Sequence, residues 1–433
     1  MIGVFLILAA VLATAFAYSP EEIIREHLQQ FKGYTRDNLC VANKCCTMSA
    51  TESCSISDMS RDQSMLVLPG GETRCIFSTS TPYAFQVIPG DSDKLLFYFQ
   101  GGGACWDENT TVKAPLCTTD VSPQSLSGIF DRADTRNEYR GHTVVFVTYC
   151  SGDVHGGDIT QSYKDSAGVP VQQKGVANAQ SALDWVKAQV AKGYLPSTFS
   201  NLVVMGCSAG SIGAQIWAKQ VLSQLSWQTA AVVPDSYAGI FPDGTMGPLI
   251  YSFGFCNTIL ASSDLMESCL AQTLTLQDID KAAMNSIHNV PFAFIQSKTD
   301  IVQQSFYISV GVSMNATQKT ITPTEFYNDV NDVFGTYNKD HANFLTYLVN
   351  GDQHCFTPSS VYYTATGAGP RVSSSGTTDL SVYEWTNTFP LKNGGSQITE
   401  CDGSIQAAEK LAADNTYCSS KVVPKTFTEK YTQ

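Results

Sequence analysis

Dense apolar runs of strand length recur along the chain and are separated by stretches with helical periodicity. The apolar runs span residues 83–87, 94–100, 142–150, 202–205, 229–236, 290–296 and 344–349. Apolar positions at helical spacing occupy residues 180–191 and 211–225. This order predicts an α/β fold with a mostly parallel central sheet and helices on both faces. Ligands in such sheets bind at the carboxyl ends of the strands, so the residues that follow each run are the first place to look for chemistry.

The run at 202–205 leads into the sequence GCSAGS, residues 206–211, just ahead of a predicted helix. A serine between small residues at a strand-to-helix turn is typical of a nucleophile elbow, in which a tight turn exposes the hydroxyl. Gly206 and Gly210 leave room for neighbouring backbone, and the helix N-terminus favours developing negative charge. A simple loop of small residues explains the same letters, because G-x-S-x-G alone is a weak signal. Ser208 therefore becomes a candidate nucleophile that needs support from the rest of the chain.

A serine nucleophile needs a histidine base, and the histidine needs an acid that orients it. In α/β-hydrolases these groups follow the order serine, acid, histidine along the chain. Asp300 and His354 come in this order, just after the apolar runs at 290–296 and 344–349. We therefore predict Ser208, Asp300 and His354 as the catalytic residues. The alternatives are His155 for the base and, for the acid, Asp235, Asp243, Asp264 and Asp352.

Three glycines follow the run at 94–100, in the sequence QGGGACW, residues 100–106. Glycines allow backbone N–H groups to face a substrate with no Cβ in the way. The oxyanion that forms during ester cleavage needs such donors, together with the N–H of the residue after the nucleophile. We predict an oxyanion hole formed by Gly102, Gly103 and Ala209; the alternative is a plain turn.

The first 17 residues form an apolar run that ends in Ala-Phe-Ala, which predicts a cleaved signal peptide; an uncleaved anchor is the alternative. Residues 18–75 carry five cysteines and form a predicted N-terminal extension, followed by a catalytic domain over 76–433. The later apolar runs are too short to cross a bilayer. We therefore expect a secreted protein with no membrane span after signal cleavage.

The chain of 433 residues carries 26 basic and 39 acidic side chains, which gives a formal net charge of −13. This charge argues against a nucleic acid as partner. Six scattered histidines and the lack of a C-x-x-C pair argue against structural zinc, and the predicted chemistry needs no metal or cofactor. Asn109 and Asn315 begin glycosylation sequons. We expect a monomer.

Five motifs together resemble the pectinacetylesterase family, which includes Notum-like deacylases. They are YFQGGGACW (98–106), YCSGDVHGGD (149–158), GCSAGS (206–211), PDS (234–236) and DQHC (352–355). The resemblance runs from about Cys75 to beyond His354. It implies an α/β-hydrolase-like fold, a Ser208–Asp300–His354 triad and an oxyanion loop at Gly102 and Gly103. Two departures, an additional Ala104 before Cys105 and Ser211 where glycine is usual, leave the chemistry intact but leave the acyl group open.

The leading functional hypothesis is a secreted serine carboxylesterase that removes O-acetyl groups from an extracellular polysaccharide. A Notum-like deacylase that removes a longer acyl chain from a protein or lipid is the first alternative, and the depth and lining of the pocket would discriminate. A catalytically inactive binding protein on a hydrolase scaffold is the second. The negative charge makes a neutral glycan a more suitable partner than polyanionic pectin, unless salt screens the repulsion or the cleft is locally basic.

Fourteen cysteines in a predicted secreted chain indicate disulfides. We expect Cys105 to pair with Cys117, Cys256 with Cys269, and Cys355 with Cys401 or Cys418. Because the elbow is tight, and because the strand that ends at Cys150 does not adjoin the elbow strand in the family's fold, Cys150 and Cys207 are predicted to be free buried thiols. The pairing among Cys40, Cys45, Cys46, Cys54 and Cys75 stays open.

Overall fold

The computed structural model describes residues 18–261, 263–365, 371–373, 376–378, 381–390, 397–398 and 426–427. The predicted signal peptide, residues 1–17, lies outside these ranges. Among the described residues, no helix combines the length and apolar character needed to cross a membrane.

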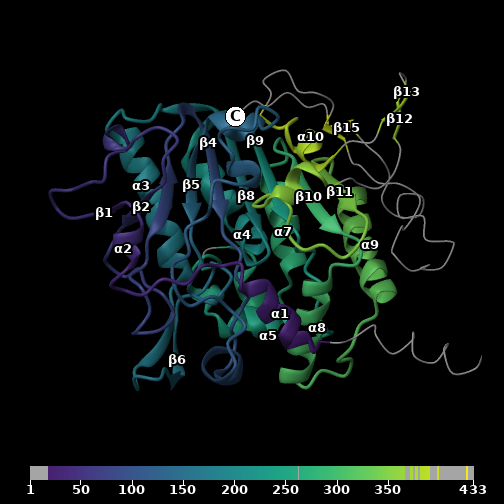
Figure 1. The fold of residues 1–433 in the computed structure, drawn as a ribbon. Helices are drawn as coiled ribbons and strands as arrows, with labels where there is room; N and C mark the ends of the chain where they lie inside the picture. The colour runs from purple at the N-terminus through teal and green to yellow at the C-terminus, as the bar shows by residue number, and fades with distance from the viewer. Residues whose placement is uncertain are drawn as a thin grey trace, which may run out of the picture.

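A nine-stranded sheet forms the centre of the molecule, in the order β1-β2-β3-β5-β4-β8-β9-β10-β11 (Figure 1). Its strands are β1 Cys45–Thr47, β2 Met65–Leu68, β3 Phe85–Ile88, β4 Asp91–Phe99, β5 His142–Val147, β8 Thr198–Cys207, β9 Ser226–Asp235, β10 Phe292–Ser297 and β11 Phe344–Val349. From β5 to β11 every neighbouring pair is parallel, whereas β3 pairs antiparallel with β5 and with β2. The predicted mostly parallel sheet is therefore confirmed.

The remaining strands form three two-stranded sheets. They are β6 Ile159–Lys164 with β7 Pro170–Gln173, β12 Arg371–Ser373 with β13 Gly376–Thr378, and β14 Gln397–Ile398 with β15 Thr426–Phe427. The α-helices are α1 Pro20–Leu28, α2 Leu39–Ala42, α3 Gly175–Ala191, α4 Ala209–Gln224, α5 Met246–Ser252, α6 Met266–Leu270, α7 Leu276–Ser286, α8 Ile301–Ser313, α9 Pro323–Asp340 and α10 Val382–Thr386. Short helical turns are η1 Ile56–Asp58, η2 Asn109–Lys113, η3 Gly128–Phe130, η4 Glu138–Gly141, η5 Phe255–Asn257 and η6 Ser360–Tyr363.

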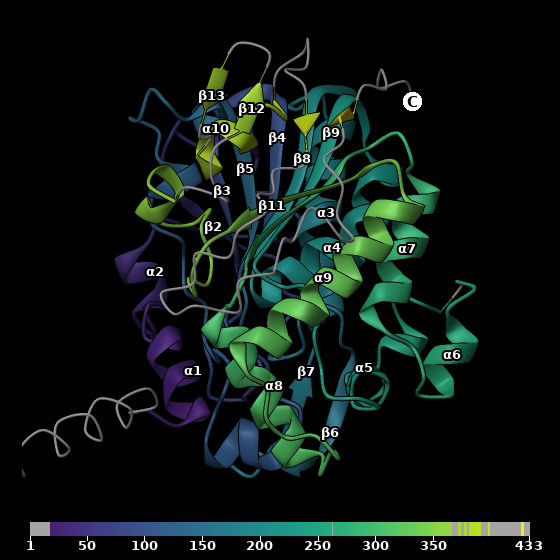
Figure 2. The ribbon, with the colours of Figure 1, turned by 90° about the vertical axis from the view of Figure 1, so that its right-hand side faces the viewer.

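The central strands are apolar throughout because both faces of the sheet are covered. Along β4, Phe97 and Phe99 face a core shared with the long helices, whereas Leu96 and Tyr98 face a second core with η3, η6 and α10. All four side chains are buried. Figure 2, seen from the side of β11, shows α8 and α9 near the viewer and α1 beside α8. One face thus carries long helices and the other carries shorter helical segments.

Polar side chains extend the elbow strand beyond its apolar run, which explains why β8 starts four residues earlier than the pattern at 202–205 indicates. Buried Asn201 donates from Nδ2 to Thr229 Oγ1 at 3.0 Å, and its Oδ1 lies 2.8 Å from His142 Nε2. These hydrogen bonds offset the cost of burying the amide, since a buried amide without partners is destabilising. Strand β8 therefore runs up to Cys207, which positions the next residue at its carboxyl end.

A buried carboxyl group in α7 makes stability depend on pH. Tyr337 donates to Asp280 Oδ2 at 2.9 Å, yet burial raises the pKa of Asp280 to about 8. In the unfolded chain an aspartate ionises near pH 4, so between about pH 4 and pH 8 the folded state holds a proton that the unfolded state has lost. Stability contributed by this group is therefore full below about pH 4 and decreases as pH rises to about 8.

We expect Asp280→Asn to remove this pH dependence, because the amide is neutral at every pH. At about 1.36 kcal/mol per pKa unit, the gain in free energy of unfolding should be on the order of 3–4 kcal/mol larger at pH 8 than at pH 5. Urea unfolding at both pH values measures it, with Asp184→Asn on the exposed face of α3 as the control. An equal gain at both pH values would contradict the assignment.

Candidate active site

Ser208 lies between the end of β8 and the start of α4, in strained backbone with φ 59° and ψ −125°. The flanking glycines are required by close backbone contacts. A Cβ on Gly206 would lie 2.1 Å from the carbonyl oxygen of Gly210, and one on Gly210 would lie 2.0 Å from that of Phe99. Both contacts are far below van der Waals distance, so the spacing of the G-x-S-x-G motif follows from the turn itself. Ser208 is 2% exposed.

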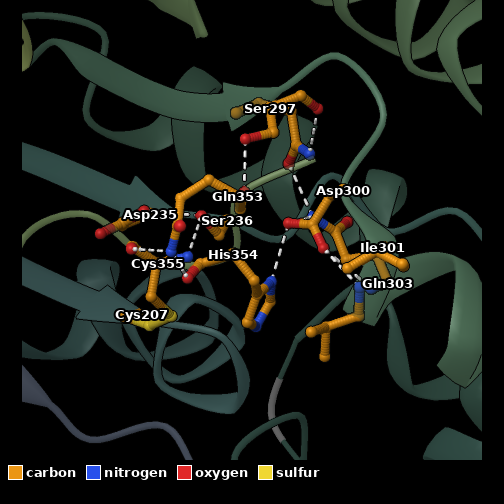
Figure 3. Close-up of polar contacts among 12 residues, drawn as sticks. Cys207, Asp235, Ser236, Ser297, Asp300, Ile301, Gln303, Gln353, His354 and Cys355 are labelled. Carbon is orange, nitrogen blue, oxygen red and sulfur yellow. Dashed lines mark hydrogen bonds and ion pairs between the residues drawn. A yellow bond between two sulfur atoms is a disulfide. The ribbon is translucent and has the colours of Figure 1, made fainter. Parts of the chain in front are cut away.

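Asp300 and His354 are brought together, although 54 residues separate them. Asp300 caps α8: its Oδ1 accepts from the backbone N–H groups of Val302 and Gln303, at 3.0 and 2.9 Å. Its Oδ2 accepts from Gln303 Nε2 at 2.9 Å and lies 2.7 Å from His354 Nδ1 (Figure 3). Because an ionised carboxylate only accepts hydrogen bonds, Nδ1 carries the proton and Nε2 has a free lone pair. This Nε2 is buried, and no described residue forms a hydrogen bond with it.

The other candidate acids have different places. Asp352 is exposed, and its backbone carbonyl accepts from Ile301 N. Asp243 and Asp264 are also exposed. Asp235 is fully buried, but it accepts hydrogen bonds from the backbone N–H groups of Phe356 and Thr357, and none from the imidazole of His354. Asp300 is therefore the one of these five acids with a described hydrogen bond to His354.

The alternative base, His155, lies inside the core. Its Nε2 is 2.8 Å from the carbonyl oxygen of Gln100, and burial lowers its pKa to about 4. The ring packs against Phe99 and Tyr149. Its contacts are those of a structural histidine beneath the glycine loop.

Asp235 anchors the loop that carries His354, a role that the sequence analysis missed. Its Oδ2 accepts from Phe356 N at 2.9 Å and from the N–H and hydroxyl of Thr357 at 2.8 and 2.7 Å. The neighbouring Ser236 accepts from Cys355 N at 2.9 Å (Figure 3). Burial raises the pKa of Asp235, and these donors oppose the rise. The PDS motif at 234–236 was the available signal, because it is part of the resemblance and had no assigned role.

Three predictions about cysteines are wrong. Cys207 is not a free thiol but forms a disulfide with Cys355, with their Cα atoms 5.7 Å apart. Cys150 is not free either and pairs with Cys75, with Cα atoms 4.9 Å apart. It follows that Cys355 does not pair with Cys401 or Cys418, which lie outside the described residues.

The error has a physical reason. Cys207 is the last residue of β8, and its side chain lies, like those of Val203 and Met205, on the sheet face opposite α4, in the same apolar cluster as Cys355, so the bridge needs no slack in the elbow. The separation of Cys150 from Cys207 was judged correctly, since β4 lies between β5 and β8. The Cys207–Cys355 disulfide joins the residue before Ser208 to the residue after His354 and so fixes these two loops next to each other.

The other disulfides agree with expectation or complete it. Cys105–Cys117 and Cys256–Cys269 are confirmed. In the N-terminal extension, whose pairing was open, Cys40 joins Cys45 and Cys46 joins Cys54. No cysteine among the described residues is free.

The glycine loop lies across the carboxyl end of β4 and is held from both sides. Ala104 N donates to Leu116 O at 3.1 Å, Thr118 N donates to Gly102 O at 2.8 Å, and the Cys105–Cys117 disulfide closes the loop. Gly103 has φ 73°, and a Cβ there would lie 2.0 Å from Leu116 O. Ala209 is the first residue of α4, so its N–H has no acceptor within the helix. The role of Gly102, Gly103 and Ala209 as oxyanion donors stays a prediction.

An apolar pocket begins beside this loop. Its walls come from the loop, from α4 one turn after Ser208, and from α8 after Asp300, and include Ala104, Trp106, Ile212, Tyr237, Phe306 and Val310. The centre of a water molecule can occupy about 60 Å³ of the pocket. The pocket is therefore narrow, and its lining is almost entirely hydrocarbon.

The N-terminal helix reaches this site, which sequence reasoning did not foresee. The ring of His27, on α1, packs edge-on against the ring of His354 with centroids 4.7 Å apart. No local pattern could have indicated a contact across so many residues.

A strained serine between a strand and a helix, together with an aspartate–histidine pair at the ends of two further parallel strands, defines an α/β-hydrolase-like protein. The chain belongs to the pectinacetylesterase family, whose family model matches residues 70–310. Membership of this family makes the protein a carboxylic ester hydrolase.

Solved structures agree on the fold. The Wnt deacylase Notum from Drosophila, in a 1.9 Å crystal form, is similar with a TM-score of 0.51 and 15% identity, covering 75% of this chain and 92% of that one. A second, 2.4 Å crystal form of the same protein gives a TM-score of 0.46 and 14% identity, over 74% and 90% of the two chains. At this identity the likeness shows the fold alone. No curated protein sequence matches the chain.

Proposed function

We propose that the protein is a secreted serine carboxylesterase with Ser208 as nucleophile, His354 as general base and Asp300 as the acid that orients it. The observation that carries the proposal is the 2.7 Å contact between His354 Nδ1 and Asp300 Oδ2, which leaves Nε2 free to accept a proton. Ser208 attacks the ester carbonyl as His354 takes its proton. His354 then protonates the leaving alcohol, and water releases the acid from the acyl-enzyme by the reverse steps.

The oxyanion of the tetrahedral intermediate would accept hydrogen bonds from Ala209 N and from Gly102 or Gly103. Support comes from the position of these groups, since α4 begins at Ala209 and Gly101 approaches Ser208 closely: a Cβ on Gly101 would lie 3.0 Å from Ser208 Cβ. Fixed backbone donors of this kind stabilise the transition state without reorganisation.

The apolar pocket favours an acyl chain longer than acetyl. The centres of water molecules can occupy about 60 Å³ of the pocket, and each water needs roughly 10–15 Å³ by this measure, so the pocket holds roughly four to six of them. A methylene group needs about as much room as one water. An acetyl group would leave most of this hydrocarbon-lined space unfilled. The geometry therefore supports the Notum-like alternative, a deacylase for a chain of medium length, over the removal of O-acetyl groups.

We expect kcat/KM for p-nitrophenyl esters to rise from acetyl to about hexanoyl. Each methylene that leaves water contributes about 0.8 kcal/mol, so four of them correspond to a rise of about two hundredfold. Rates across a series from two to twelve carbons measure this. A maximum at acetyl would instead support the polysaccharide O-acetylesterase that the sequence suggests.

A variant pair on α8 tests the pocket directly. Val310 is buried in the pocket wall, whereas Val312 is 56% exposed on the same helix. Val310→Phe should shift the preference toward shorter chains, and Val312→Phe should leave it unchanged. Equal profiles for the two variants would place the acyl chain elsewhere.

Several features support secretion. The described residues contain six disulfides, which persist in oxidising compartments. Asn109 and Asn315, which begin the two sequons, are both exposed and so accessible to glycosylation. Residues 1–17 would direct the export.

A further inference from the structure

A second, polar cavity adjoins the proposed catalytic residues on the side away from the acyl pocket. Water centres can occupy about 500 Å³ of it. Its inner wall includes Gly101, Cys207 and Cys355, the direct neighbours of the oxyanion loop, Ser208 and His354. Amide and hydroxyl side chains, such as those of Gln100 and Ser122, make up much of the remaining lining. This cavity is therefore suited to a polar group that lies next to the reacting bond.

The N-terminal extension supplies the outer wall of this cavity. Gln30, Phe31, Lys32 and Tyr34 line it, opposite the ends of the sheet strands. Lys32 is the one charged side chain among the described lining residues, and its Nζ lies 4.9 Å from the centroid of the Tyr34 ring. In a chain with a net charge of −13, a cavity whose lining carries only a positive charge is locally basic.

The same segment begins at the proposed base. His27 is the last but one residue of α1, and its ring packs on His354. Burial and the nearby His354 lower the pKa of His27 well below its ordinary value, so its imidazole is neutral. Helix α1 lies beside α8 (Figure 2) and is held by a capping box at Ser19, by buried Ile24, and by a hydrogen bond of 3.4 Å from Ser309 on α8 to Glu21. His27 thus lies directly against the proposed base.

An ester extends in two directions from its carbonyl carbon. If the acyl half occupies the apolar pocket, as the proposed function holds, the alcohol half must leave the serine on the other side, where the polar cavity lies. We propose that residues 27–34 form the alcohol subsite and decide which esters react: they accept hydroxylated alcohols, prefer a negative charge on the alcohol, and limit its bulk next to His354. This inference rests on the proposed function.

Charge selectivity is the first test. Two butyryl esters that differ only in the alcohol, ethanol or glycolate, are compared by kcat/KM at low ionic strength. Lys32→Gln should lower the glycolate-to-ethanol ratio about three- to fivefold, the effect of one exposed charge pair, and added salt should lower the wild-type ratio in the same way. Lys192→Gln, an exposed lysine after α3 with the same change in net charge, is the control.

Bulk selectivity is the second test. His27→Ala should raise kcat/KM for the butyryl ester of a branched alcohol relative to the ethyl ester several-fold, without a shift in acyl-chain preference. Arg25→Ala, on the exposed side of the same helix, is the matched control. A lower rate with every ester in equal proportion would mean that His27 only supports the fold.

The two tests separate this inference from the function beneath it. A change in either selectivity ratio, absent from its control, supports the alcohol subsite, whereas no change in both overturns it. Labelling by a fluorophosphonate reports separately on the nucleophile. If Ser208 is labelled and both ratios stay constant, the subsite is wrong and the esterase stands; if Ser208 is not labelled, the proposed function itself fails.

Discussion

Ser208→Ala is expected to lower kcat by about a millionfold, because nucleophile and base act as one unit; the oxyanion donors and substrate binding should leave a residual rate roughly a thousandfold above the uncatalysed one. The substitution removes one oxygen and keeps the volume close to that of the original side chain. The strained backbone at φ 59° is equally strained for serine and alanine, so the free energy of unfolding should stay within about 1 kcal/mol. Hydrolysis of p-nitrophenyl hexanoate, with urea unfolding as the check on the fold, measures both.

A fluorophosphonate should label Ser208 in the wild-type protein and no residue in the variant. Peptide mapping after labelling identifies the site. Full activity in Ser208→Ala, or labelling of another serine, would contradict the proposed mechanism. A wild-type protein that neither reacts with the probe nor hydrolyses any ester would support the inactive binding protein instead.

The parts of the fold that the sequence predicts are those set by local patterns. Strands β4, β8, β10 and β11 are buried on both faces, so their apolar runs are continuous and easy to locate. Once the strands are parallel, their carboxyl ends share one edge of the sheet, and the residues that follow them must meet there. This is why the placement of Asp300 beside His354 could be foreseen from order alone.

What could not be foreseen depends on pairs far apart in the chain. Cys207 and Cys355 are 148 residues apart, and their bridge depends on which face of the sheet each side chain occupies at a turn. The alternation along β8 gives the face of Cys207, which follows Val203 and Met205, but no strand pattern gives the direction of Cys355, which lies in the loop after β11. The contact between His27 and His354 depends on how α1 packs on α8. The sequence of α1 is mostly polar and does not indicate which element it packs against.

The N-terminal extension illustrates the same limit. Its cysteines predict a stapled segment, and two short disulfides do staple it. Yet β1 and β2 also join the main sheet next to β3, so the extension shares the sheet of the hydrolase body. Strands of three and four residues are too short for a reliable pattern, and pairing with β3 is what defines them.

Asp300→Asn is expected to lower kcat about ten-thousandfold while the exposed Asp352→Asn stays within about twofold of wild type. The reason is the hydrogen bonding around Asp300. Two backbone N–H groups, of Val302 and Gln303, hold one side-chain oxygen, so the new amide would keep its oxygen there and turn its NH₂ toward His354. A donor facing Nδ1 forces the ring proton onto Nε2, and the base can then no longer accept the proton of Ser208.

The same geometry supplies the control on stability. The new NH₂ would also face Gln303 Nε2, which now donates to Oδ2 at 2.9 Å, so one hydrogen bond is lost and the free energy of unfolding should fall by about 1–3 kcal/mol. The protein stays folded, and loss of activity far beyond this destabilisation identifies Asp300 as the acid that sets the tautomer of His354. Initial rates with p-nitrophenyl hexanoate and urea unfolding of both variants decide the matter. Greater damage from Asp352→Asn than from Asp300→Asn would move the acid to the exposed residue and make the buried carboxylate a helix cap only.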